Sequence, residues 1–386
     1  MDAEATNARS PTRLAAGARS GPDDRGTGPV ASEPALLRRH PALRALPRAP
    51  FVLSATPVEP LALAGLPPGA CFVKRDDRSC ALYGGNKPRK LEFVLGAAAA
   101  RGARRLVTTG GIGTHHGLAT AILGRSLGMA TTVICVPQPL TKHVLEQLEA
   151  MLAFGAELRF ARSVPGAAVQ TVRALARSAL AGERPQLVPT GGSSAIGDIG
   201  FVSAAFELAE QIETGVLPAP KEIYLPVGSG GSLSGLALGA RLAGLRARIL
   251  GVLLTDILPP GPRRIAALAR ATLARLRRLD PTLPAVSIGP ADFEITRAQI
   301  GPGYGAETEE GLRAAQRASS AGLTLEQTYT AKCLSELLAR QADGRAKSPS
   351  LFWNSYNSVD FWAHIPARPG LDGLPASLRR WIAEQD

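Results

Sequence analysis

The sequence is poor in the features that mark membrane, secreted or metal-binding proteins. Aromatic residues make up only 5% of its 386 positions, and no uninterrupted apolar run approaches the roughly 20 residues that cross a bilayer. The N-terminus has no apolar signal core. The cysteines are scattered without metal-type pairing, which fits reduced thiols packed as small core residues. We therefore expect a cytoplasmic protein with no membrane contact and no metal site. The cysteines are Cys71, Cys80, Cys135 and Cys333.

Positive charge is in excess, with a formal net charge of +12, but its distribution argues against a nucleic-acid partner. One stretch concentrates arginine, and its spacing with leucine and isoleucine predicts an amphipathic helix with a basic face. No aromatic residues interleave there to stack on bases, so we expect a solvated or subunit-contacting face. The arginines are Arg263, Arg264, Arg270, Arg275, Arg277 and Arg278.

Strand and helix patterns alternate along most of the chain. This alternation predicts an α/β protein with mostly parallel, twisted sheets flanked by helices, and the length suffices for two domains. Residues 1–36 lack periodicity and are expected to form a disordered tail. The predicted strands are 104–109, 130–136, 157–160, 186–189, 222–227 and 247–255, and helices are expected from His115, Thr141, Val164, Ala195 and Ser232.

A lysine stands between a glycine pair and the start of a predicted helix, in the segment Gly84-Gly85-Asn86-Lys87-Pro88-Arg89-Lys90. Desolvation and a second cation such as Lys90, one turn away, can lower the pKa of Lys87 enough for its amine to form a Schiff base with an aldehyde. The alternative is a basic helix start with solvated lysines.

Two further glycine clusters follow predicted strands and open helices. They are Gly110-Gly111-Ile112-Gly113-Thr114-His115-His116-Gly117 and Gly228-Ser229-Gly230-Gly231-Ser232-Leu233-Ser234-Gly235. Such turns present free backbone N–H groups at the positive end of a helix, where anions bind. The second cluster suits a phosphate and the first suits a carboxylate.

Together these segments resemble the pyridoxal-phosphate enzymes built like the tryptophan synthase β-subunit, and within them the D-cysteine desulfhydrase and 1-aminocyclopropane-1-carboxylate deaminase group. The resemblance extends from about Leu53 to Phe361 and includes Pro189–Ser194 and Tyr329-Thr330-Ala331-Lys332. It implies two domains with pyridoxal 5'-phosphate in the cleft between them, and we expect a homodimer. The smaller domain would be 92–205, and the larger would combine 37–91 with 206–386.

The resemblance also implies a role for each candidate residue. Lys87 would hold the cofactor and act as catalytic base, with Thr114 and Tyr329 as further catalytic residues. The expected cofactor-binding residues are Lys87, Lys90, Asn86, His115, Gly228, Ser229, Gly230, Gly231, Ser232, Thr330 and Asn354. The expected substrate-binding residues are Thr114, His115, His116, Tyr304 and Tyr329.

Three departures from the family pattern bear on the substrate. His115 replaces an asparagine that meets the ring hydroxyl, and a histidine, unlike that neutral amide, can itself titrate near neutral pH. Thr330 replaces a glutamate of the deaminase branch near the pyridine nitrogen, and Asn354 replaces a threonine at that nitrogen. An amide can donate or accept a hydrogen bond, which leaves the protonation state of the ring open.

We therefore expect a lyase or deaminase that removes the α-proton of a small amino acid. β-Elimination from D-cysteine or a similar β-substituted alanine, giving a keto acid and ammonia, is favoured over 1-aminocyclopropane-1-carboxylate deamination. Two functions of a different class also stay open. An NAD-dependent dehydrogenase would use Gly228, Gly230 and Asp256, although Leu233 stands where its third glycine is required. A pseudoenzyme would keep the fold and bind a ligand without turnover.

Overall fold

The described part of the chain is built around two mostly parallel sheets. The computed structural model describes residues 33–53, 55–63 and 65–385. The larger sheet has six strands in the order β1-β2-β10-β7-β8-β9, and the smaller has four in the order β5-β4-β3-β6. β1 is antiparallel to β2, and the other pairings are parallel. The predicted α/β class is confirmed.

The strands of the larger sheet are β1 (Val58–Pro60), β2 (Cys71–Lys74), β7 (Glu222–Val227), β8 (Arg248–Leu253), β9 (Glu294–Thr296) and β10 (Ser350–Trp353). Those of the smaller sheet are β3 (Arg105–Gly111), β4 (Ala130–Val136), β5 (Glu157–Phe160) and β6 (Pro185–Leu187). The predicted strands are thereby confirmed, with small shifts at some ends.

The α-helices are α1 (Ala35–Arg39), α2 (Asn86–Ala100), α3 (His115–Ser126), α4 (Lys142–Ala153), α5 (Val164–Leu180), α6 (Ile199–Glu213), α7 (Gly231–Ala243), α8 (Pro262–Leu279), α9 (Glu309–Ser320), α10 (Thr330–Ala342) and α11 (Ala376–Ala383). Short 3-10 helices lie at Pro41–Ala45, Asp76–Arg78, Thr190–Gly192, Pro290–Asp292 and Phe361–His364. No helix among the described residues is long and apolar enough to cross a membrane.

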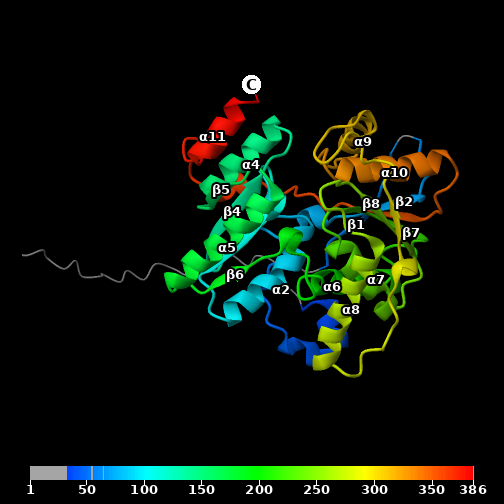
Figure 1. Cartoon of the computed structure of the whole chain (residues 1–386). Helices are drawn as coiled ribbons and strands as arrows, with labels where there is room; N and C mark the ends of the chain where they lie inside the picture. The colour runs from blue at the N-terminus through cyan, green and yellow to red at the C-terminus, as the bar shows by residue number, and fades with distance from the viewer. Residues whose placement is uncertain (1–32, 54, 64, 386) are drawn as a thin grey trace, which may run out of the picture.

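Apolar side chains cover both faces of the larger sheet because β7 is buried on both sides. Ile223 and Leu225 join a cluster with α6, α7 and α8, whereas Tyr224 between them joins a cluster with α9 and α10. Alternate residues of a strand point to opposite faces, so each cluster fills one side. The smaller sheet packs against α2, α3, α4 and α11 in one cluster and against α5 in another. Figure 1 shows α4, α5 and α11 beside the smaller sheet and α7, α9 and α10 beside the larger.

Four of the α-helices have a hydroxyl residue at the N-cap position. The Oγ atoms of Thr114, Thr141, Ser163 and Thr308 each accept a hydrogen bond from the backbone N–H three residues on. Such caps satisfy donors that have no partner within the helix. The predicted basic helix is α8, whose Ile265 and Leu276 are buried while most of its arginines are exposed.

The structure differs from the sequence prediction at two helix starts. The tail predicted for 1–36 lies mostly outside the described residues, but α1 begins at Ala35 and buries Ala35 and Leu36, so the predicted tail is too long. The helix expected from Ala195 begins at Ile199, because residues 195–198 form a turn that precedes it.

The domain division stays a prediction. Its expected boundaries, after residues 91 and 205, fall inside α2 and α6, which continue through both points. The C-terminal α11 packs on the smaller sheet through Leu378 and Trp381, although 206–386 was assigned to the larger domain.

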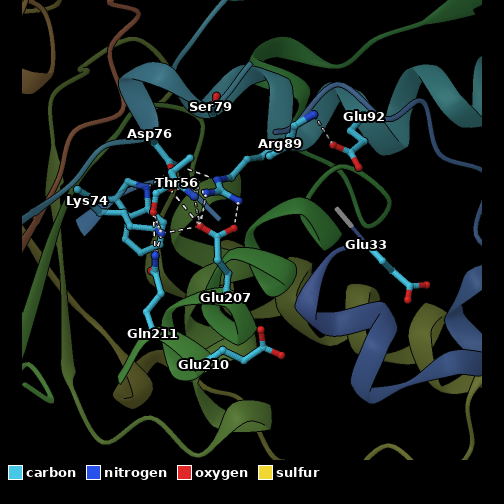
Figure 2. A network of polar contacts seen from close by, with 12 residues as sticks. Glu33, Thr56, Lys74, Asp76, Ser79, Arg89, Glu92, Glu207, Glu210 and Gln211 are labelled. Carbon is cyan, nitrogen blue, oxygen red and sulfur yellow. Dashed lines mark hydrogen bonds and ion pairs between the residues drawn. The ribbon is translucent and has the colours of Figure 1, made fainter. Parts of the chain in front are cut away.

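A buried network of charged side chains fixes α2 against β2 and α6 (Figure 2). Arg89 of α2 donates to Asp76 Oδ1 at 2.6 Å and to Glu207 Oε2 of α6 at 2.9 Å. Lys74 of β2 also pairs with Glu207, and its Nζ donates to Gln211 Oε1 at 2.7 Å. Since two cations face two carboxylates, no net charge is left buried. These contacts with β2 and α6 therefore fix α2, the helix that carries Lys87.

Candidate active site

Lys87 lies in the first turn of α2 with its amine in a desolvated setting. Its Nζ donates to Asn86 Oδ1 at 2.7 Å, and its side chain keeps part of its surface accessible. Burial of the amine, reinforced by the charge of Lys90, lowers the pKa of Lys87 to about 7, although Glu326 opposes the shift. A large fraction of the amine is then neutral at physiological pH, as a nucleophile or base requires.

The glycine pair before Lys87 lets α2 begin at this point. A Cβ on Gly84 would lie 1.8 Å from the Asp77 carbonyl oxygen, and one on Gly85 would lie 2.6 Å from the Ser355 carbonyl oxygen. Gly85 also has a φ of +88°, which side chains disfavour. No other residue fits without moving the backbone that precedes Lys87.

The phosphate cradle predicted at Gly228–Ser232 lies beside this lysine. Ser193 Oγ contacts Ser229 Oγ at 2.7 Å, accepts the Gly231 N–H at 3.1 Å and lies 3.2 Å from Lys90 Nζ. Asn86 Nδ2 donates to Ser232 Oγ at 3.2 Å. Hydroxyls, a buried cation and the start of α7 thus converge on one point, which is the donor set that a phosphate needs.

The Asn354 side chain can donate a hydrogen bond to a ring nitrogen, because only one end of its amide has a hydrogen-bond partner in the part of the chain that the structure describes. Its Oδ1 accepts the Tyr356 N–H at 3.3 Å, whereas its Nδ2 is buried without a hydrogen-bond partner among the described residues. The backbone donor fixes which end of the amide is the oxygen. An orphaned N–H donor suits an unprotonated pyridine nitrogen, so the residues present fit pyridoxal 5'-phosphate.

His115 is the centre of a hydrogen-bonded chain that joins α3, α4 and the bend that holds Tyr83. Its Nδ1 lies 2.8 Å from Tyr83 Oη, and its Nε2 lies 3.0 Å from His143 Nε2 of α4. The Tyr356 ring packs edge-on at 5.4 Å. Burial, then the charges of His143 and Lys87, hold the pKa of His115 well below its ordinary value. Burial therefore favours the neutral form of His115 over the charged one.

His116 and Thr114 serve the local fold at the start of α3. His116 is 4% exposed, and its Nε2 bonds to Thr108 Oγ1 at 3.0 Å, which ties the ring to β3. Thr114 Oγ1 accepts the Gly117 N–H at 3.2 Å as a helix cap. The structure thus gives both predicted substrate-binding residues a structural task.

Tyr329 and Tyr304 form a pair next to the cradle. Their ring centroids are 6.0 Å apart, and a Cβ on Gly228 would lie 2.9 Å from Tyr329 Oη. Burial raises the pKa of both phenols, so both remain protonated and can donate. The hydroxyl of Thr330, predicted near the cofactor ring, accepts the Glu326 N–H at 3.1 Å and so completes a turn.

Sequence reasoning missed Glu326, whose carboxylate accepts the N–H groups of Thr328, Tyr329 and Thr330 at 2.7–2.9 Å. It raises the pKa of Lys87 against the effect of burial. The available signal was an acidic residue four positions before Thr330, where the structure begins α10. Ser193 and His143 were also missed as site residues. Among the described residues, no group of three or more His, Cys, Asp or Glu side chains is arranged to hold a metal ion.

The chain belongs to the family of pyridoxal-phosphate dependent enzymes, whose family model matches residues 51–355. It is 33% identical over 319 residues to the nocardicin C-9' epimerase of Nocardia uniformis subsp. tsuyamanensis, covering 81% of this chain and 93% of that relative. It is 30% identical over 333 residues to a D-cysteine desulfhydrase of Yersinia enterocolitica, covering 84% and 98%. Its fold resembles a solved structure described as an ACC deaminase homologue, with a TM-score of 0.68, 24% identity and coverage of 84% and 95%.

These findings confirm the predicted family, an enzyme of the pyridoxal-phosphate class, and its cofactor. They overturn the dinucleotide alternative. In the structure, Leu233 is fully buried where a third glycine would stand, and Asp256 Oδ1 accepts the Tyr304 N–H at 3.0 Å.

Proposed function

We propose that this protein is a lyase that releases ammonia and a keto acid from a small amino acid, with D-cysteine or a similar β-substituted alanine as substrate. The observation that carries the proposal is Lys87, which lies beside a phosphate cradle with a pKa lowered to about 7. The D-cysteine desulfhydrase and ACC deaminase homologues support a lyase or deaminase within the family.

Each group at the site has a distinct task in this reaction. Lys87 would bind the cofactor aldehyde, and Asn354 would donate a hydrogen bond to its ring nitrogen. The cofactor phosphate would be held by Ser193, Ser229, Gly231 and Lys90. When bound, the cofactor withdraws electrons from the substrate and makes the α-proton acidic. The incoming substrate amine would displace Lys87 from the aldehyde, and the freed, neutral Lys87 amine would then accept that proton.

Further side chains would position the substrate and complete the elimination. The first turn of α3, which begins at His115, offers backbone N–H groups to the substrate carboxylate. Tyr329 and Tyr304 keep their phenol protons, because burial raises the pKa of each, and would donate to the departing sulfide. With Asn354 donating to the ring nitrogen and Thr330 bonded to Glu326, the pyridine would stay unprotonated. A weak electron sink favours loss of a good leaving group over opening of a cyclopropane ring.

The direct test is the ratio of kcat/KM for D-cysteine and 1-aminocyclopropane-1-carboxylate on one preparation of the holoenzyme. Sulfide and keto-acid release are measured together, with L-cysteine as the stereochemical control. We expect D-cysteine to be turned over at least about tenfold better, which corresponds to about 1.4 kcal/mol in barrier height. Faster turnover of the cyclopropane amino acid would overturn the argument from Thr330 and Asn354.

A second candidate is inversion at the α-carbon, which the similarity to an epimerase raises. Inversion needs a second proton-handling group besides Lys87, and the chain Tyr83–His115–His143 could supply one, because both its hydrogen bonds are 3.0 Å or shorter. In D₂O an epimerase would convert one enantiomer into the other with deuterium at the α-carbon and without keto-acid release. His143→Phe would then abolish inversion while exchange at Lys87 continues.

A pseudoenzyme would keep the fold and bind the cofactor without turning over any amino acid. A purified protein with a visible absorbance that borohydride bleaches, but without activity on amino acids of either hand, would support it.

Location and assembly belong to the proposal as well. The four cysteines are buried and unpaired, as expected of a protein in the reducing cytoplasm. We propose a cytoplasmic homodimer on the family resemblance, and sedimentation equilibrium of the full chain tests the dimer.

A further inference from the structure

Asp198 is a buried acid without a task in the proposed reaction. It is fully buried immediately before α6, and neither carboxylate oxygen has a hydrogen-bond partner among the described residues. An ionised carboxylate in such a place is strongly unfavourable unless a cation faces it or a proton neutralises it. The surroundings of Asp198 therefore decide its charge.

The carboxyl lies against the phosphate cradle. A Cβ built on Gly231, the first residue of α7, would be 2.5 Å from Asp198 Oδ1 and 2.3 Å from Ser193 Oγ. Ser193 is the hydroxyl that accepts the Gly231 N–H and contacts Lys90. The acid therefore approaches the helix start where a phosphate would bind, and both anions would use the same positive end.

Lys90 is the charged group that faces Asp198. Burial raises the pKa of Asp198 to about 7, and the charge of Lys90 opposes this shift. Burial likewise lowers the pKa of Lys90 to about 8, and Asp198 opposes that shift. Of the other neighbours, the Ser234 side chain of α7 and the Ser194 backbone also act to lower the pKa of Asp198. Ser193 Oγ approaches the same point beside Gly231, and burial holds the pKa of His116 of α3 well below its ordinary value. Arg89 of α2 is already paired with Asp76 and Glu207.

We propose that Asp198 couples capture of the cofactor phosphate to the uptake of one proton. Without phosphate the carboxylate is the anion whose charge Lys90 compensates. A phosphate dianion in the cradle replaces it as the partner of Lys90, and Asp198 accepts a proton from solvent and becomes a neutral acid. Otherwise three negative charges would share one lysine and one helix start at low dielectric.

The pH dependence follows from the free-state pKa of about 7. Below that pH the acid is already neutral and binding takes up no proton at this site. Above it, phosphate raises the pKa of Asp198 further, and affinity falls by up to about tenfold per pH unit. The phosphate itself does not contribute at pH 8, because its second pKa is about 6.

The test uses the full-length Lys87→Ala variant and pyridoxine 5'-phosphate, which carries the phosphate but no aldehyde. Calorimetry at pH 8 in two buffers of different ionisation enthalpy measures the total proton uptake, to which Lys90 also contributes because its pKa is about 8. Infrared difference spectra, bound minus free, locate it: a protonated carboxyl band should appear, shift in D₂O, and vanish in the added Asp198→Asn variant. Glu210→Gln, a carboxyl change on the exposed side of α6, should leave the band in place.

Three outcomes would overturn the proposal: no proton uptake, uptake without a carboxyl band because Lys90 takes the proton, or a band that survives Asp198→Asn. If Asp198→Asn does not fold, ¹³C labelling of aspartate carboxyl carbons still assigns the band to an aspartate or excludes one. If the phosphate ester does not bind at all, the predicted phosphate cradle is itself wrong. The proposal is independent of the substrate, so failure of D-cysteine turnover leaves it unaffected.

Discussion

At the residue scale, the site depends on ionisable groups whose pKa values burial moves toward neutrality. The pKa values of the Lys87 and Lys90 amines are lowered to about 7 and about 8, and the pKa of the Asp198 carboxyl is raised to about 7. Each shift has burial as its largest cause, because the charged form loses its hydration. The sequence predicts which lysine stands at the glycine pair, but burial comes from the packing of α2, α6 and α7 together.

Lys87→Ala should lose the visible absorbance of the lysine-bound cofactor and essentially all turnover, while the protein stays folded. The reason is that no other amine at the start of α2 replaces both its covalent and its base role. Absorbance spectra, borohydride reduction with peptide mapping, and circular dichroism measure this. Lys221→Ala, a change of an exposed lysine, is the control. A reducible cofactor adduct mapped to another lysine in the Lys87→Ala protein would move the site.

Lys90→Met should raise the pKa of Lys87 above its value of about 7, since the charge of Lys90 is the second cause of the lowering. A smaller fraction of the freed Lys87 amine is then neutral at pH 7, so the acid limb of the kcat profile, which reports the substrate-bound enzyme, should move to higher pH. The profile is measured with saturating cofactor, because Lys90 also faces the cradle. An unshifted acid limb would show that burial alone sets the pKa of Lys87.

At the scale of elements, turn glycines place the helix starts that the site uses. The strand-glycine-helix pattern predicted the cradle and the start of α3, since each strand has a clear apolar run. The pattern cannot show that Glu326 accepts three backbone N–H groups in the turn that leads into α10, or that His143 of α4 meets His115 of α3. Those contacts depend on how helices distant in sequence pack.

Gly230→Val should weaken cofactor binding much more than Gly244→Val, a change at the other end of α7. Both glycines have positive φ, +88° and +73°, so both substitutions carry a backbone cost of about 1–2 kcal/mol. Only at Gly230 does a Cβ meet neighbours, at 2.9 Å from Ile265 and 3.2 Å from Pro260, whereas nothing lies within 4 Å at Gly244. Cofactor retained after dialysis measures the difference. Equal retention in the two variants would show that the phosphate binds elsewhere.

At the scale of the whole molecule, the network in Figure 2 joins segments that the sequence shows only as separate charges. Lys74, Asp76 and Arg89 lie within 16 positions of one another, but Glu207 comes from a helix more than 100 residues later. Alternation of strands and helices predicted the four strands of the smaller sheet and β7 and β8 of the larger, because that pattern is local, but not β1, β2, β9 and β10. It could not pair Glu207 with Arg89, since periodicity carries no information about which charged residues meet.

Glu207→Gln should therefore destabilise the protein by about 3–5 kcal/mol at pH 7, because Lys74 and Arg89 lose the carboxylate that compensates their burial. Burial alone would raise the pKa of Glu207, but Arg89 and Lys74 outweigh it and hold that pKa below its ordinary value. A lowered acid pKa stabilises the fold above the unfolded value of about 4.5 and is lost as pH falls below it. Wild-type stability should thus decline in acid more steeply than that of the variant.

Denaturant unfolding from pH 7 to pH 3 measures both effects. Glu210→Gln on the same helix is the matched control, since its partner Arg38 is 44% exposed and such a surface pair contributes under about 1 kcal/mol. The network fixes α2 to β2 and α6, so Glu207→Gln should also loosen the packing that desolvates the Lys87 amine. The pKa of Lys87 should then rise. A variant as stable as Glu210→Gln, with an unchanged Lys87 titration, would show that α2 is held by its apolar contacts alone.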